Sequence, residues 1–191
     1  MRLVRKAVRA LERGQPGVAL KQLQDAHLLD PSNCDALYWM GLLMSRQDRA
    51  EEAVEALSLV SERIPGLPEV EGALADAYLG MGQPNAAIFH AQRLMDSSPY
   101  ATASLIKLAE AFEAAGKLDL ATQALEQAPI HKRTLSEELV RVHYRLGSLY
   151  EKRGNPEQAL HHFKRVYGRD ITFKDVMARI EALEQDLPEL G

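Results

Sequence analysis

The chain has 191 residues, of which 46% are hydrophobic and 26% charged, and this composition excludes a disordered chain. Its formal net charge of −4 argues against a general nucleic-acid binder, because such proteins need a basic surface. A single cysteine excludes an internal disulfide framework, and no apolar run reaches the roughly 20 residues of a membrane span, so we expect a cytoplasmic protein without a transmembrane segment.

Small residues recur in two rows along the chain. The first row is spaced 34, 34, 34 and 38 residues apart, and the second row repeats these intervals. A fixed period in this range indicates a solenoid, in which each unit buries its apolar face against its neighbours. Because there is no strand-like alternation, the chain is predicted to be all-α. The first row is Ala7, Gly41, Ala75, Ala109 and Gly147, and the second is Ala19, Ala53, Ala87, Ala121 and Ala159.

The first predicted unit, residues 1–33, is a hairpin of two helices whose first helix is strongly basic. A basic helix can lie on a membrane surface or contact an acidic partner. The alternative is that the charges form only the solvated face of a helix whose other face packs inside the repeat. The register of Ala7 and Ala19 favours this alternative. The basic side chains are Arg2, Arg5, Lys6, Arg9 and Arg13.

The next three units follow the same pattern of two helices joined by a turn. In the second unit Leu37, Gly41 and Met44 recur at helical spacing, and the second helix is expected to end before Pro65. The small residues allow the two helix axes to approach closely, where a larger side chain does not fit. The three units are predicted at about 34–67, 68–101 and 102–135.

The fifth unit, about residues 136–171, follows the longer interval of 38 residues. Thr134 and Glu137 have the spacing of a capping box, which predicts a helix that begins near Leu135. Four extra residues make about one helical turn, so we expect an elongated helix and no additional loop. A final amphipathic helix over about 172–186 is predicted to cap the array, and residues 188–191 to form a tail. The apolar stripe predicted for this capping helix is Phe173, Val176, Met177, Ile180 and Leu183.

With these small residues, turns and prolines at fixed intervals, the chain resembles the tetratricopeptide repeat family over about residues 1–171. The family's usual tryptophan near the start of each repeat is replaced in different units by Leu37, Glu71 and His143. The resemblance implies a right-handed α-solenoid of antiparallel helix hairpins, forming one domain over residues 1–187.

The resemblance also implies that the first helix of each hairpin lines a concave, peptide-binding groove. The groove is then apolar in its N-terminal part and acidic in the middle. A row of solvent-facing apolar side chains marks a binding site. The alternative is that curvature or a neighbouring helix buries them. The groove residues implied are Val4, Val8, Leu11, Tyr38, Leu42, Glu69, Asp76, Ile106, Glu110, Glu113 and Tyr144.

Motifs that carry chemistry are missing from the sequence. We find no phosphate-binding loop, no glycine-rich dinucleotide turn and no hydrolase or metalloprotease signature. Adjacent His161 and His162 point to different faces of a helix, and no second histidine or cysteine lies at helical ligand spacing. We therefore expect no enzyme activity, no catalytic residue, no cofactor and no metal site.

The resulting hypothesis is an adaptor or scaffold that binds a peptide or amphipathic helix of another protein. Two alternatives stay open. One is a dedicated chaperone for a secretion or envelope-assembly substrate. The other is a structural protein that forms homo-oligomers through its uncapped N-terminal edge.

Overall fold

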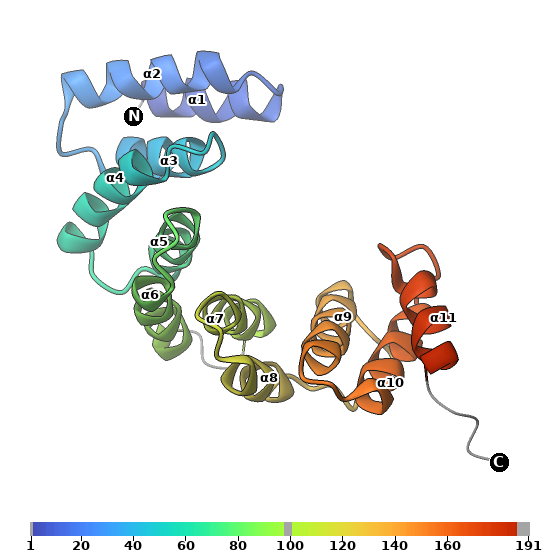
Figure 1. Ribbon diagram of the computed structural model, residues 1–191. Coiled ribbons are helices and arrows are strands. Elements are labelled where there is room, and N and C mark those ends of the chain that lie inside the picture. The colour runs from blue at the N-terminus through green and yellow to red at the C-terminus, as the bar shows by residue number, and fades with distance from the viewer. Residues whose placement is uncertain (1, 98–100, 187–191) are drawn as a thin grey trace. The chain divides into compact units, whose positions relative to one another are not determined.

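The structure is a computed structural model in which residues 2–97 and 101–186 are described (Figure 1). These residues form eleven α-helices and no strand, which confirms the predicted all-helical fold. The helices are α1 (Arg2–Glu12), α2 (Pro16–Leu29), α3 (Cys34–Ser45), α4 (Ala50–Arg63), α5 (Pro68–Gly80), α6 (Pro84–Ser97), α7 (Thr102–Ala114), α8 (Leu118–Glu126), α9 (Glu137–Lys152), α10 (Pro156–Tyr167) and α11 (Val176–Asp186).

The helices divide into two compact units. Unit 1 is Met1–Ser98 and contains α1 to α6, and unit 2 is Pro99–Gly191 and contains α7 to α11. The single domain over residues 1–187 stays a prediction, and the predicted tail lies outside the described residues.

Within each unit the successive helices pair as antiparallel hairpins, and the rows of small residues lie where the paired helices cross. Ala7, Ala19 and Ala87 have no exposed surface. A Cβ atom added to Gly41 would lie 2.6 Å from Cγ of Leu57, which is closer than real Cβ atoms come to their neighbours. Small side chains are thus required at these crossings for steric reasons.

Two expectations for the start of the fifth unit are wrong, namely the capping residue and the absence of an additional loop, whereas the expected elongated helix is present. Helix α9 begins at Glu137, and Ser136 caps it by accepting a hydrogen bond from the backbone N–H of Leu139 (3.3 Å), so Thr134 is not the cap. Helix α8 ends at Glu126 and residues 127–136 form a loop, because Pro129 cannot continue a helix. Helix α9 is nevertheless elongated, with 16 residues.

The predicted capping helix begins later than expected, at Val176, after a run of turns. It packs on α10 with Val176 fully buried and Leu183 8% exposed. Met177 was expected on the buried stripe but is 53% exposed. The reason is that Val176 and Leu183, seven residues apart, set the buried face, and Met177 lies about 100° away from Val176 around the helix.

Candidate functional site

A hollow of about 500 Å³ opens in unit 2 between α7, α9 and the turn that precedes α11. Of the predicted groove residues, Ile106, Glu110 and Tyr144 lie together in its wall. The complete lining is Ala103, Ile106, Lys107, Glu110, Glu138, Arg141, Tyr144, Arg145, Phe173 and Lys174.

The apolar wall of this hollow is built around Tyr144. Its ring meets the ring of Phe173 edge-on, with centroids 5.4 Å apart, and Nζ of Lys174 lies 4.5 Å from its centroid. Its hydroxyl donates a hydrogen bond to Asp175, and burial raises its pKa, with this hydrogen bond adding to the effect. Tyr144 was expected to face an open groove but is only 9% exposed, because the turn before α11 covers it.

The acidic middle of the predicted groove is largely paired with cations. Arg145 forms ion pairs with both Glu110 and Glu113, the latter at 3.5 Å. Lys152 approaches Glu113 to 2.6 Å, and Lys107 approaches Glu110 to 3.2 Å. The hollow therefore presents less negative charge than the sequence suggests.

Cations outnumber carboxylates in the lining of the hollow, four to two. Arg141 and Lys174 form no ion pair with any described residue, and Arg141 is exposed. The hollow thus combines an apolar wall with a rim that carries a positive excess. This arrangement suits a segment with an apolar side chain and a neighbouring acidic group.

Unit 1 holds the remaining predicted groove residues. Val4 was expected to face solvent but is 7% exposed, because it lies on the stripe by which α1 packs into the first core cluster. Val8 and Leu11 are half-buried, and Tyr38 and Leu42 pack partly against the second cluster, whereas Glu69 and Asp76 are exposed. Burial raises the pKa of Tyr38, and the charge of Glu69 raises it further.

The basic face of α1 is exposed, and none of its cations pairs with a carboxylate within residues 2–97. The opposite face packs on α2 through Ala7 and Ala10. This is the arrangement expected for the first helix of a repeat with a solvated outer face.

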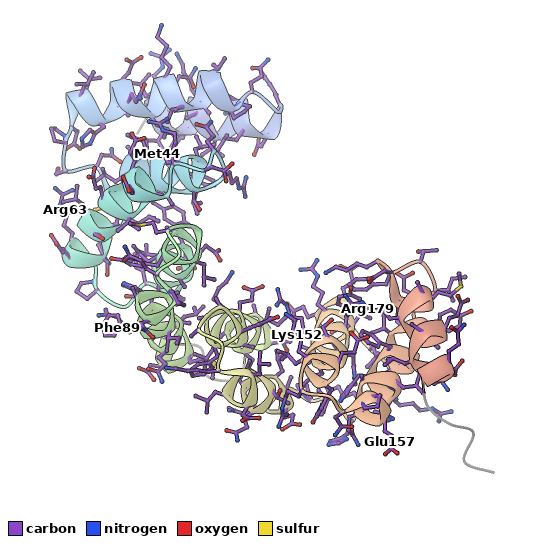
Figure 2. All side chains as sticks on the ribbon, viewed as in Figure 1. Met44, Arg63, Phe89, Lys152, Glu157 and Arg179 are labelled. Atoms are coloured by element: carbon purple, nitrogen blue, oxygen red, sulfur yellow. The ribbon has the colours of Figure 1, made fainter. Side chains whose placement is uncertain are left out.

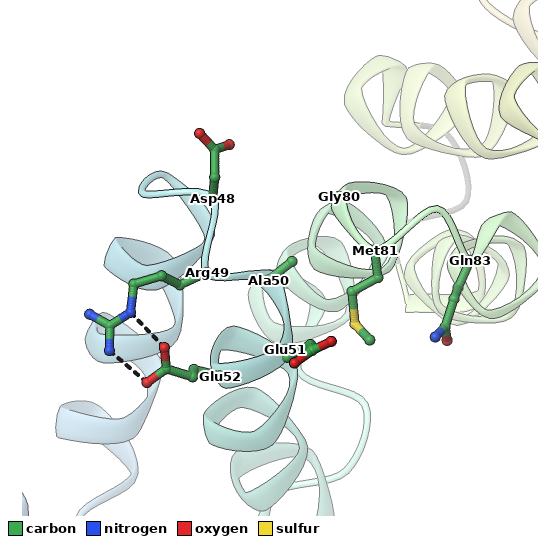
Figure 3. Close-up of a pocket in the computed structure, with 8 residues that line it drawn as sticks. All are labelled: Asp48, Arg49, Ala50, Glu51, Glu52, Gly80, Met81 and Gln83. Atoms are coloured by element: carbon green, nitrogen blue, oxygen red, sulfur yellow. Dashed lines mark hydrogen bonds and ion pairs between the residues drawn. The ribbon is translucent and has the colours of Figure 1, made fainter.

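Unit 1 also has a hollow, of about 320 Å³, which lies beside the turns of the second and third hairpins (Figure 3). The guanidinium of Arg49 donates two hydrogen bonds, both 2.6 Å long, to the carboxylate of Glu52. Arg49, the only cation in the lining, is therefore paired with Glu52, and the other charged side chains of the lining, Asp48 and Glu51, are carboxylates. We assign no function to this hollow.

Sequence reasoning missed a buried polar network between α5 and α6. Glu71 is fully buried, with Oε2 2.7 Å from Nδ1 of His90 and Oε1 2.9 Å from Nε of Arg93. The ring of Tyr78 stacks on His90 with centroids 5.3 Å apart. Phe89 is exposed on the outside of α6 (Figure 2). The guanidinium of Arg93 lies over its ring, 5.7 Å from the centroid. A carboxylate at this depth is tolerated because it is paired and hydrogen-bonded.

A pair of buried histidines was also missed. Nδ1 of His143 lies 2.9 Å from Nδ1 of His162, and Nε2 of His143 lies 3.2 Å from the carbonyl oxygen of Ile130. A carbonyl can only accept, so Nε2 of His143 carries a proton, and in the neutral ring Nδ1 of His143 then accepts from Nδ1 of His162. The ring of Tyr150 stacks on His162 with centroids 5.5 Å apart. Burial lowers the pKa of both side chains well below 7, so both histidines are neutral at pH 7.

These two clusters share one position in the repeat. Glu71 and His143 both lie four residues before the small residue of the first row, where the family has tryptophan. Their partners, His90 and His162, both lie three residues after the alanine of the second row. A titratable residue at the tryptophan position is the signal from which the networks could have been found.

The histidine pair predicts acid-sensitive stability of unit 2. Burial lowers the pKa of His143 from 6.5 to about 4 and that of His162 from 6.5 to about 3. Below pH 6.5 the unfolded chain then binds more protons than the folded chain, so this part of the stability is present above pH 6.5 and is lost as the pH falls towards 4 and 3. Thermal unfolding of the wild-type chain and of a His143→Gln/His162→Gln variant between pH 7.5 and 4 is the measurement. We expect the melting temperature of the variant to depend less on pH, and equal slopes would contradict this assignment.

The described residues contain no group of three or more His, Cys, Asp or Glu side chains placed to hold a metal ion. Within residues 2–97 and 101–186, every helix is too short or too polar to cross a lipid bilayer.

A family model described as tetratricopeptide repeat matches residues 10–77, and a model described as the fifth ARM repeats domain of TT21 matches residues 68–176. No curated protein sequence matches the chain.

Three solved structures illustrate the likeness in fold. TTC0263, a thermophilic TPR protein of Thermus thermophilus, is 18% identical with a TM-score of 0.71, and the match covers 96% of this chain and 98% of that one. MamA of Desulfovibrio magneticus RS-1 is 19% identical with a TM-score of 0.77, covering 90% and 95%. YrrB, described as a TPR protein with an unusual peptide-binding site, is 20% identical with a TM-score of 0.71, covering 97% and 91%. At these identities the likeness shows a shared fold.

Proposed function

Because this chain belongs to the tetratricopeptide repeat family, we propose that it is a non-catalytic interaction module that binds a peptide or helix of another protein. The observation that carries the proposal is the hollow of unit 2, which lies on the first helices of its two hairpins. The peptide-binding site in the name of the YrrB structure supports this general function.

The lining of the hollow favours a particular kind of segment. Ile106, Tyr144 and Phe173 offer an apolar wall, and an aliphatic or aromatic side chain gains by burial against it. Arg141 and Lys174 at the rim attract an acidic neighbour of that side chain. We therefore propose a ligand with an apolar anchor followed by Asp or Glu. The acidic groove predicted from the sequence would instead favour a ligand segment that carries Lys or Arg.

The test begins with affinity capture of partners by the full chain, followed by titration of the interacting peptide. Ile106→Ala is expected to weaken binding by up to about 1.5–3 kcal/mol through lost apolar burial. Arg141→Glu is expected to slow association and flatten its salt dependence, because an exposed charge acts by long-range steering.

Matched controls lie on α8 and at its start. Leu120→Ala removes a partly exposed apolar side chain, and Lys117→Glu reverses an exposed charge, both outside the hollow. Neither is expected to change the affinity. If these controls weaken binding as much as the variants of the hollow do, the site lies elsewhere on the molecule.

The purified chain and its captured partner also distinguish the two alternatives, a dedicated chaperone and a self-assembling protein. A dedicated chaperone would keep its captured partner soluble, whereas an adaptor would leave the partner's solubility unchanged. A self-assembling protein would show a mass that rises with concentration in light scattering. Leu28 and Leu29 on α2 favour some association, since they are 78% and 80% exposed.

A further inference from the structure

A second recess in unit 2, of about 370 Å³, lies between the loop 127–136 and the C-terminal end of α10. Four of its lining side chains are cationic, namely Arg133, Lys164, Arg165 and Arg169. No carboxylate is part of the lining. The recess is separate from the hollow of the proposed function, with which it shares no residue.

The loop holds two of the guanidinium groups in place. Arg165 donates a hydrogen bond of 2.5 Å to the carbonyl oxygen of Lys132, and Nε of Arg169 donates one of 3.2 Å to that of Leu135. Each guanidinium has five N–H donors, so several remain for a ligand after these contacts. Because the loop fixes these side chains beforehand, a ligand has less conformational entropy to overcome.

The charges of the recess are poorly compensated. Lys164 pairs with Glu184 at 2.7 Å, but this pair is about half exposed. The side chains of Arg133, Arg165 and Arg169 form no ion pair with any described residue. The positive charge of Arg165 also acts on the neighbouring histidines. Burial is the main reason that the pKa values of His143 and His162 are low, and the charge of Arg165 lowers both further.

We propose that this recess binds a dianionic phosphoryl group, either free phosphate or a phosphomonoester. Arginine forks match the oxygens of a phosphoryl group in pairs, and charge-assisted hydrogen bonds of this kind are the strong ones. The hydroxyl group of Thr134, which lines the recess and does not cap α9, adds a further donor. A single carboxylate carries one charge and two oxygens, and would leave more of the four cations uncompensated.

The experiment is calorimetric titration of the full chain with inorganic phosphate and, separately, with O-phospho-L-serine at constant ionic strength. We expect saturable binding of at least one of them. Tighter binding of inorganic phosphate identifies the free ion as the source of the group, and tighter binding of O-phospho-L-serine identifies a monoester. Arg133→Glu is expected to weaken binding about tenfold or more.

The matched control is Lys117→Glu, an exposed charge reversal in the same unit and outside the recess. It is expected to leave the affinity unchanged. Thr134→Ala, which keeps every charge, should weaken binding by a smaller factor than Arg133→Glu. The exposed side chains of Arg133 and Thr134 make no hydrogen bond within residues 101–186, so both variants should fold.

Three outcomes would overturn the proposal. One is the lack of saturable binding of either probe to the wild-type chain. Another is an equal loss of affinity in Arg133→Glu and Lys117→Glu, which would show that net charge alone attracts the anion. The third is binding only to vesicles of anionic phospholipid, which would assign the basic side chains to a membrane surface.

Discussion

Glu71→Ala is expected to lower the free energy of unfolding of unit 1 by about 3–5 kcal/mol, the cost of breaking a buried ion pair from one side. The substitution leaves Nδ1 of His90 and the guanidinium of Arg93 without the carboxylate that they share. It also leaves a cavity where the side chain had no exposed surface. Urea unfolding followed by tryptophan fluorescence measures this effect in unit 1, because the chain's only tryptophan, Trp39, lies there.

The control for this prediction is Glu69→Ala, two residues earlier on the same helix. Glu69 is exposed, so its loss is expected to change the stability by no more than about 0.5 kcal/mol. Glu71→Gln keeps the shape and one hydrogen bond but removes the charge, and should fall between the two. Equal stability of Glu71→Ala and Glu69→Ala would show that the buried network does not hold α5 to α6.

Gly147→Ala is expected to lower the free energy of unfolding of unit 2 by about 3 kcal/mol or more. Overpacking a filled core typically costs about 1–3 kcal/mol, and this substitution should lie at the upper end of that range or beyond it. The added Cβ would lie 2.6–2.8 Å from three atoms of the Phe163 ring, and that ring is fully buried. A rigid aromatic ring in a filled core has little room to move aside. Thermal unfolding followed by circular dichroism measures the loss.

Two further variants test whether the clash with Phe163 is the cause. Gly72→Ala also places alanine inside a helix, but its Cβ meets only Leu94, at an ordinary 3.6 Å. It should stabilise unit 1 by roughly 0.5–1 kcal/mol, because alanine favours the helix over glycine. Phe163→Leu should cost less in the Gly147→Ala background than in the wild type, since the smaller side chain relieves the overlap. Strict additivity of the two substitutions would argue against the clash.

The hairpins could be predicted from the sequence because their determinants are local and repeated. Alanine and glycine at a fixed period indicate where the helices cross, and the structure buries them there. The residue at which the first helix of the fifth unit begins could not be predicted from this period. Thr134 and Ser136 are both acceptable caps by residue type, and in the structure Ser136 is the cap. Pro129, three residues after the end of α8, is the signal of a break that the argument from helical turns overlooked.

The candidate site was harder to predict, because its exposure depends on contacts between distant segments. Tyr144 was expected to be open, and the turn before α11 closes over it. Glu110 and Glu113 were expected to carry free negative charge, but Arg145 on the next hairpin neutralises both. A single sequence gives the face of a helix on which a residue lies, but not which side chain from another hairpin covers or pairs with it.

The buried pairs Glu71–His90 and His143–His162 affect which helices of similar hairpins can pack together. In an array of similar units, the first helix of one hairpin could exchange with that of another, within a chain or between chains. If α9 replaced α5 against α6, the neutral His143 would stand opposite Arg93 and leave that cation unpaired and partly desolvated. If α5 replaced α9 against α10, Glu71 would meet His162 and Arg165, which stand at the same positions relative to Ala159 as His90 and Arg93 do to Ala87. The exchange of α9 for α5 thus carries an electrostatic penalty that the reverse exchange lacks, and this penalty discriminates between hairpins whose apolar surfaces are similar.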